Sequence, residues 1–298
     1  MLARRVIWGV MILLYGLIGL LGVIVLAPNT FPGADLAVFQ QAGSDLLNTG
    51  NPYASNATAH YNFQYRYPPL LAMVIPLVGW PPLWYALLFA STAVVFYYWY
   101  QDAGWFGILP IVMLAGPWGQ PLINGNVQPI LMLLLAVVPR FARAGAVALA
   151  VATMLKLHPA LGTLWYVGRR DWRGLAWYVG AMAVLLLVQA PWMGLFLDYY
   201  QNDSDASIAL YHGWGLRLAG DLAWIIGSVI TGVLAWRFAP SRYGWMLNLV
   251  FQLAALPRLL PTNLALLLAG PLPSRRRSDK TSSADPQRST QTDATSSS

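Results

Sequence analysis

The sequence predicts an all-α polytopic membrane protein, a bundle of about ten transmembrane helices of which several are short or broken. Hydrophobic residues make up 57% of the 298 residues and charged residues only 10%, whereas a soluble domain is about 25% charged. Long apolar runs alternate with short polar links, and most arginines cluster in those links, as membrane topology requires. We therefore expect a lipid bilayer to surround most of the chain.

The composition also excludes several kinds of chemistry. The chain has no cysteine, so it has neither a thiol nucleophile nor a disulfide. Its 11 acidic residues are all aspartates. The 18 basic residues outnumber them, but their clustering between apolar runs indicates membrane topology and no nucleic-acid partner.

The first apolar run, 6–27, is long enough to cross the hydrocarbon and follows Arg4 and Arg5. Residues 27–29 make a poor cleavage site, so the run is expected to remain as the first helix. The positive-inside rule then places the N-terminus in the cytoplasm and the loop 28–68 outside.

The following segment, 69–80, decides the topology. It is short and bounded by prolines, so we interpret it as re-entrant or interfacial on the outer side. Every later arginine cluster then faces the cytoplasm, as does the C-terminus. The remaining spans are expected at 82–100, 105–121, 125–139, 144–157, 159–168, 174–191, 218–236, 243–257 and 262–273.

The chain is thus predicted to form one membrane-embedded domain, 1–273, and a disordered cytoplasmic tail, 274–298, which is rich in Ser, Thr, Asp and Arg. Several spans are short for a full crossing. Short or proline-broken helices at membrane depth are tolerated where they line protein or a water-filled cavity, so we expect a cavity that opens outward. The expected location is the plasma membrane.

Asp35 is the main catalytic candidate. It begins a candidate interfacial helix, 35–47, in the long external loop. A carboxylate at the outer interface can act as a general base toward a hydroxyl group. The structural alternative is a helix N-cap, for which Asp is also favoured.

The predicted topology leaves four basic residues on the outer side, where the positive-inside rule gives no reason for them: Arg66, Lys156, Arg217 and Arg258. Ionisable groups at membrane depth are functional hypotheses by default, although Lys156 could instead snorkel to the interface. His212 lies close to Arg217 in the last outer loop and is a candidate for the same phosphate-binding role.

Aromatic and amide residues surround these charges in the sequence. Arg66 lies between two tyrosines, and a guanidinium pairs well with oxyanions while rings stack on sugars. A polar hinge, 124–129, separates two apolar runs, and a histidine follows Lys156 closely. The structural alternatives are rigid turns and helix caps. The candidates of this group are Tyr53, Tyr65, Tyr67, Asn126, Gln128 and His158.

Five short motifs occur in a fixed order. They are Asp35 with Phe39 after the first helix, G-N-P-Y at 50–53, Y-x-Y-P-P at 65–69, G-N-x-Q-P at 125–129 and K-x-x-P at 156–159. This order resembles the polyprenol-phosphate-sugar-dependent glycosyltransferases of fold type C, most closely family 87, which includes mycobacterial α-1,2-mannosyltransferases. The resemblance covers about residues 1–170 and fades beyond them.

The resemblance implies an inverting enzyme that moves a hexose, expected to be mannose, from a polyprenyl-phosphate donor to a hydroxyl on a lipid or glycan acceptor outside the membrane. Asp35 would be the general base. The donor phosphate would contact Arg66, Lys156, His212, Arg217 and Arg258. The sugar or acceptor would contact Tyr53, Tyr65, Tyr67, Asn126, Gln128 and His158.

No cofactor is expected. A divalent metal is possible, since aspartates 198, 203 and 205 lie close together in the sequence, but the pattern gives it little support. Two alternatives remain. A transporter or flippase of an anionic lipid-linked sugar would use the same basic residues without needing Asp35 as a base, and the chain could be an inactive member of the family.

Overall fold

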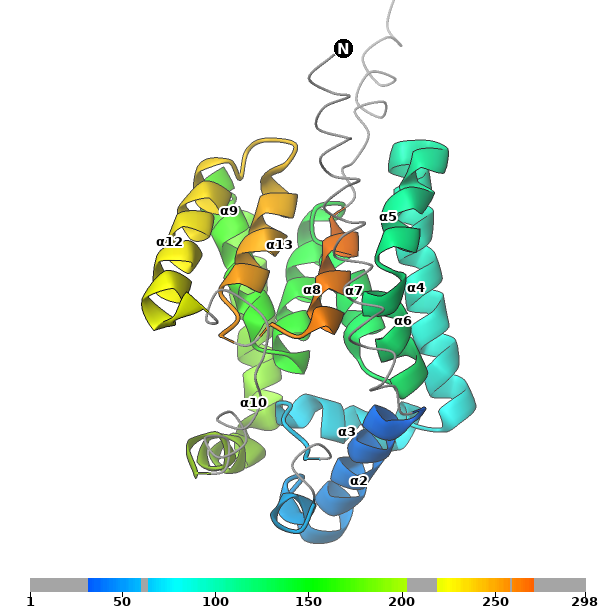
Figure 1. Cartoon of the computed structure of the whole chain (residues 1–298). Coiled ribbons are helices and arrows are strands. Elements are labelled where there is room, and N and C mark those ends of the chain that lie inside the picture. Colours follow the sequence, from blue (N-terminus) through cyan, green and yellow to red (C-terminus); the bar gives the residue numbers. More distant parts are fainter. Residues whose placement is uncertain (1–31, 60–63, 203–218, 258, 271–298) are drawn as a thin grey trace, which may run out of the picture.

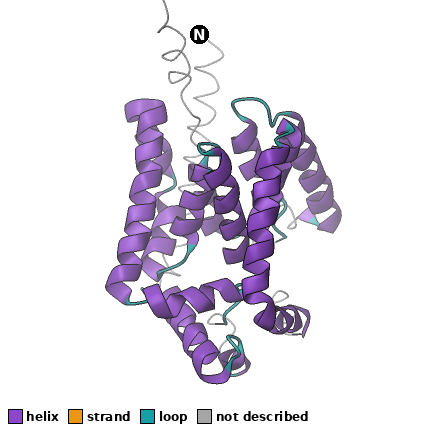
Figure 2. Ribbon diagram, turned by 180° about the vertical axis from the view of Figure 1, so that it is seen from behind, coloured by secondary structure: helices purple, strands orange, loops and turns teal. Residues whose placement is uncertain are grey.

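The computed structural model describes residues 32–59, 64–202, 219–257 and 259–270. Within these ranges every regular element is a helix, and no strand forms (Figure 2). This confirms the predicted all-α class. The elements are α2 (Ala34–Thr49), η2 (Ala54–Ala57), α3 (Pro69–Val78), α4 (Pro81–Ala103), η4 (Gly104–Gly107), α5 (Ile108–Met113), α6 (Ala115–Asn124), α7 (Gln128–Val137), α8 (Ala142–Leu155), η5 (His158–Gly162), α9 (Thr163–Arg169), α10 (Trp172–Asn202), α12 (Asp221–Arg237), α13 (Gly244–Ala254) and η7 (Pro261–Ala269).

Helices α4, α7, α8, α12 and α13 begin and end within about three residues of the predicted spans, which is close to the precision with which helix ends are defined. The span expected at 105–121 is instead divided into η4, α5 and α6, where Pro117 lacks the N–H that would continue the hydrogen-bond pattern. The last expected span, 262–273, is the 3-10 helix η7. The predicted first helix, 6–27, and the tail, 274–298, lie outside the described residues.

Two described segments are long and apolar enough to cross a membrane, Pro81–Met113 and Trp172–Gln201. Four shorter apolar helices, α3, α7, α8 and α13, have 10–17 residues. Helix α10 carries its apolar side chains on the outside, with Leu187 74% and Val184 60% exposed. Such a surface suits lipid. The count of ten spans stays a prediction.

Helices α2 and α3 lie across one end of the bundle (Figure 1). They pack closely on each other, because Gly43 of α2 leaves no room for a side chain: a Cβ there would lie 2.4 Å from the Ile75 side chain. The start of α3 is fixed to α10, since the Leu70 N–H donates to the buried Gln189 Oε1 over 2.8 Å. Residues 69–80 therefore form a short helix that rests on the bundle end and is too short to span.

Two hydrophobic cores meet near α7. One core joins α2, α3 and α4 and includes Phe39, Ile75 and Trp84. The other joins α7, α8, α13 and η7 and includes Leu131 and Leu149. The start of α7 lies where these two cores adjoin. Val127, just before the helix, belongs to the first core, and Leu131, in its first turn, belongs to the second. Polar groups at this junction are thus enclosed by apolar packing on two sides.

The arginine-rich links lie at the other end of the bundle. Figure 1 shows the α12–α13 connection, which contains Arg242, opposite α2 and α3. At the ends of α4 and α7, Arg140 forms an ion pair with Asp102 and lies over the Tyr98 ring, 4.3 Å from its centroid. This grouping agrees with the expected positive-inside topology, although the side of the membrane stays a prediction.

The turn before α7 should be intolerant of a side chain. Gly125 has φ +74°, and a Cβ there would lie 2.8 Å from Leu36 Cβ. Gly125→Ala is expected to destabilise the protein by at least about 1–2 kcal/mol, because the left-handed conformation penalises L-residues and α2 must move away. Gly119→Ala is the matched control, since nothing lies within 4 Å of that Cβ. Thermal unfolding in detergent tests this, and an equal effect of both changes would contradict it.

Candidate functional site

Asp35 lies in the first turn of α2 and is not the N-cap. The N-cap is Gly33, and no side chain caps the helix. The Gly33 N–H donates to the Ile123 carbonyl over 3.1 Å, and the Tyr85 hydroxyl donates to the same carbonyl over 2.9 Å. These bonds fix the start of α2 against the end of α6. The carboxylate is therefore available for another role.

Asn126 is the hydrogen-bonding partner of Asp35. Its Nδ2 donates to Asp35 Oδ2 over 3.0 Å and to the Tyr67 hydroxyl over 3.3 Å, and its Oδ1 accepts the Gln128 backbone N–H over 2.9 Å. The last bond sets which end of the carboxamide is oxygen. The turn itself is held by the Trp84 indole N–H, which donates to the Gly125 carbonyl over 2.8 Å. The hinge predicted at 124–129 thus directs an amide at Asp35.

Lys156 follows directly after α8 and continues this polar chain. Its Nζ donates to Gln128 Oε1 over 3.4 Å and to Asn263 Oδ1 over 3.2 Å. Its charge also acts on Asp35, so the two groups share one polar region. Among the described residues the only ion pair is Arg140–Asp102. Lys156 therefore has amide partners there in place of a carboxylate partner in direct contact.

The environment of Asp35 makes its carboxyl group a weaker acid. Burial raises its pKa above the ordinary value, while the Asn126 hydrogen bond and the Lys156 charge act in the opposite direction. A carboxyl group with a raised pKa is a stronger base when ionised. Its Oδ1 accepts no hydrogen bond from the described residues, so that oxygen is free to meet a substrate hydroxyl.

Two further buried nitrogen atoms belong to neighbours of Lys156. Gln128 is its hydrogen-bond partner, and His158 follows it by two residues in the sequence. Gln128 Nε2 and His158 Nε2 are both buried, and neither has a hydrogen-bond partner among the described residues. Buried polar atoms are nearly always paired. These two nitrogen atoms are therefore candidates to hydrogen-bond a polar ligand.

The three tyrosines have different surroundings. Tyr65 is buried, and its hydroxyl donates to the Pro68 carbonyl and accepts the Ala72 N–H. Tyr53 donates to the Tyr67 carbonyl over 2.9 Å. The hydroxyls of Tyr53 and Tyr65 therefore hold the loop in shape, whereas Tyr67 presents its hydroxyl toward Asn126. Stacking of these rings on a sugar stays a prediction.

The remaining candidates are placed less directly. Arg66 is half-buried, with Nη2 donating to Gln64 Oε1 over 3.4 Å, and its charge acts on Tyr67. It therefore lies near one edge of the Asp35 cluster. His212, Arg217 and Arg258 lie outside the described residues. Their assignment to a donor phosphate stays a prediction.

Sequence reasoning missed two buried amides. Asn263 contacts Lys156, and Gln189 accepts the first free N–H of α3. Each lies inside an apolar run, where an amide must find a partner, and that alone could have marked it. Among the described residues no three His, Cys, Asp or Glu side chains gather as metal ligands. The absence of a cofactor stays an expectation.

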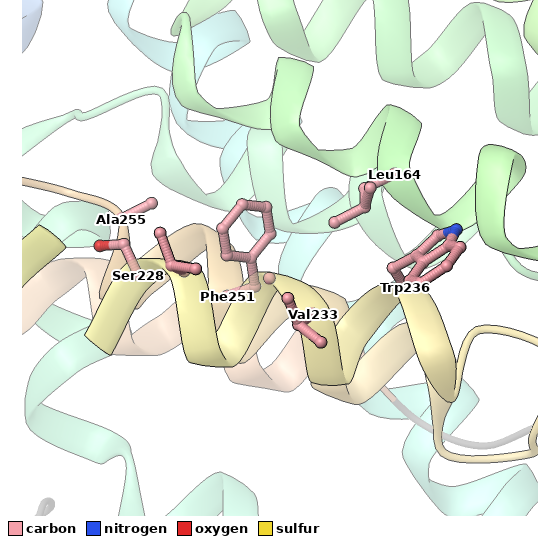
Figure 3. A pocket seen from close by; sticks show the side chains of 8 residues that line it. Leu164, Ser228, Val233, Trp236, Phe251 and Ala255 are labelled. Carbon is pink, nitrogen blue, oxygen red and sulfur yellow. The ribbon is translucent and has the colours of Figure 1, made fainter. Parts of the chain in front are cut away.

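A separate pocket of about 450 Å³ lies between α9, α12 and α13 (Figure 3). Its lining residues are Leu164, Ser228, Val229, Gly232, Val233, Trp236, Phe251 and Ala255. None of them is titratable, and the Ser228 hydroxyl donates to the Ala254 carbonyl over 3.2 Å. The pocket has no group for acid–base chemistry, so it is not an alternative to the Asp35 cluster.

The described residues thus form an all-helical fold with two segments long and apolar enough to cross a membrane, and with a carboxylate and an ammonium in one polar region. The model of glycosyltransferase family 87 matches residues 65–270. The chain therefore belongs to glycosyltransferase family 87. The matched range includes Tyr65, Tyr67, Asn126 and Lys156, while Asp35 precedes it. Neither the curated proteins nor the solved structures compared with the chain give a match.

The Asn126–Asp35 bond leads to a pH prediction. The bond favours the ionised carboxylate, so Asn126→Ala should raise the pKa of Asp35 further. A general base must be ionised, so the acidic limb of the pH–rate profile of sugar transfer should move to higher pH. Gln101→Ala is the control, because this amide lies near the end of α4 and donates to the Tyr97 hydroxyl. An acidic limb that stays in place in Asn126→Ala would show that Asp35 does not control it.

Proposed function

We propose that this glycosyltransferase moves a hexose, mannose in the first instance, from a polyprenyl-phosphate donor to a hydroxyl of a lipid or glycan acceptor on the outer face of the plasma membrane. The observation that carries the proposal is the hydrogen-bonded chain from Asp35 through Asn126 and Gln128 to Lys156. It joins one base and one cation, the two groups that the reaction needs.

The reaction proceeds with inversion in this proposal. The Asp35 carboxylate takes the proton of the acceptor hydroxyl while that oxygen attacks the anomeric carbon of the sugar. The bond between the anomeric carbon and the phosphate oxygen breaks, and the electron pair leaves with polyprenyl phosphate. The Lys156 ammonium stabilises the charge that develops on the phosphate.

The position of Asp35 supports this role. The side chain is half-buried, so a substrate can reach it, and the Asn126 bond orients one oxygen while Oδ1 remains available. Tyr67 accepts a bond from Asn126 and keeps its own O–H. Burial, followed by the Asp35 charge, raises the pKa of Tyr67, so this O–H stays protonated and can donate to an acceptor oxygen.

The external helix explains how the site meets two lipid-soluble substrates. Helices α2 and α3 cover the bundle end (Figure 1), and their outward side chains Leu47 and Leu77 are 72% and 79% exposed. Such residues suit the membrane interface. A donor with its chain in lipid then presents its phosphate to the polar region between α2 and the start of α7.

Transfer of labelled mannose from polyprenyl-phosphate-mannose in membranes tests the proposal. Asp35→Asn should lower transfer by about 100-fold or more, because proton transfer typically contributes 10²–10⁴-fold. Asp45→Asn is the matched control in the same helix. The Asp45 carboxylate accepts hydrogen bonds from the Ser55 N–H and hydroxyl. Its loss should therefore lower transfer only as far as it lowers the amount of protein in the membrane.

Transfer that survives Asp35→Asn at an equal protein level would place the base elsewhere. If mannose is not transferred by the intact chain, a panel of other polyprenyl-phosphate hexoses identifies the sugar. Failure of the whole panel, together with movement of the lipid-linked sugar across vesicle membranes, would favour the transporter alternative.

A further inference from the structure

The last described helix contributes a residue to the candidate site. Asn263 lies in η7, 107 residues beyond Lys156 in the chain, and accepts a hydrogen bond from Lys156 Nζ over 3.2 Å. It is 3% exposed. Helix η7 packs against α6 and α7 and belongs to the second hydrophobic core. The amide is therefore held in place by the packing of η7 on α6 and α7.

The two amide bonds leave one donor of the ammonium unused. A lysine has three N–H donors, and among the described residues Gln128 and Asn263 accept two of them. The Oε1 atom of Gln128 accepts one of these bonds. The Nε2 atom of the same carboxamide is buried and has no partner among the described residues. One N–H of Lys156 and the Nε2 group of the carboxamide bonded to it thus have no acceptor among the described residues.

We propose that Asn263 is a positioning residue that holds the Lys156 ammonium so that its third N–H and the Gln128 Nε2 group together bind a phosphate oxygen of the donor. This inference rests on the proposed function, because the donor phosphate is the anion in question. It adds Asn263 as a positioning residue and gives Gln128 a phosphate contact in place of a sugar contact.

The chemistry of the amide fits this role better than that of an acid. A carboxylate at 263 would pair with Lys156 and cancel its charge. An amide oxygen accepts the bond and orients the ammonium while leaving the positive charge in the low-dielectric region. That charge then remains available to a phosphate, for which charge-assisted hydrogen bonds are the strong ones.

The charged and titratable groups near this cluster come from several elements. Lys156, at the end of α8, acts on Asp35 and lowers the pKa of its carboxyl group from where burial would place it. Asp35 and Arg66 both act on Tyr67 in the loop before α3, and Lys156 acts on His158 of η5. The position of the ammonium therefore affects the ionisation of Asp35.

Binding of farnesyl phosphate to the purified full chain in detergent tests the inference without catalysis, with farnesol as the uncharged control. Asn263→Leu should weaken farnesyl phosphate binding by about tenfold or more, since bonds to charged groups have this weight, and should leave farnesol binding unchanged. Asn263→Asp, which is close in shape, should weaken it at least as much. When Lys156→Met is already present, adding Asn263→Leu should have little further effect on farnesyl phosphate binding.

Asn248→Leu is the matched control. Asn248 is a buried amide of α13 that bonds to the Leu161 carbonyl and to Gln252 and does not contact Lys156. A merely structural role of Asn263 predicts that both Asn→Leu changes act alike on farnesyl phosphate and farnesol. That result, or unchanged phosphate binding in Asn263→Asp, would overturn the inference. So would an intact chain that binds farnesyl phosphate no better than farnesol.

The pH profile of transfer separates this inference from the proposed function. The Lys156 charge favours ionisation of Asp35. Release of Lys156 in Asn263→Leu should therefore raise the pKa of Asp35 and move the acidic limb of the profile to higher pH. Asn248→Leu should leave it in place. If Asp35→Asn abolishes transfer but still binds farnesyl phosphate, the result supports Asp35 as the general base. If Asn263→Leu loses farnesyl phosphate binding, the result bears only on the positioning of the Lys156 ammonium.

Discussion

A carboxylate and an ammonium that are partly buried beside apolar packing need polar partners, and this requirement shapes the end of the bundle. An unpaired buried charge costs several kcal/mol. Here the partners are amides: Asn126 donates to Asp35, while Gln128 and Asn263 accept from Lys156. Because amides satisfy the charges without neutralising them, both groups keep the ionic character that a transfer reaction needs.

The fold brings the two charged groups and their amide partners together from four separated parts of the chain. Asp35 comes from α2, the Asn126–Gln128 turn joins α6 to α7, Lys156 ends α8 and Asn263 lies in η7. The turn is the centre of the arrangement. Its glycine contacts Leu36 of α2, and its carbonyl is held by Trp84 of α4. The two hydrophobic cores meet here, so their packing fixes the distance between the charges.

Much of this could be predicted from the sequence. Apolar runs and proline or glycine breaks located α4, α7, α8, α12 and α13, because lipid-facing helices need long apolar stretches. Asp35 and the hinge were recognised as polar interruptions between apolar runs, and Lys156 because an ionisable group is costly at membrane depth. Family 87 was also recognised from these motifs. Asp35 as the base stays a prediction, as do the sugar and the topology.

Other features could not be predicted, for physical reasons. Asn263 meets Lys156 across 107 residues, and no local pattern encodes such a contact. The 3-10 helix η7 lies in an apolar run that resembles the other spans, and its conformation depends on tertiary packing that outweighs helix propensity. The sequence predicts that Tyr65 stacks on a sugar. In the folded loop its hydroxyl is hydrogen-bonded to two main-chain groups, and the sequence alone does not indicate these bonds.

Asp35 and Lys156 act on each other within one polar network. A double-mutant cycle on thermal stability in detergent measures this interaction, with Asp35→Asn, Lys156→Met and the two changes combined. We predict that the double variant is more stable than the sum of the single effects implies, with a coupling above about 0.5 kcal/mol, because each single change leaves the other charge without its counterpart. Additive effects would show that the two charges are independent and would contradict the account.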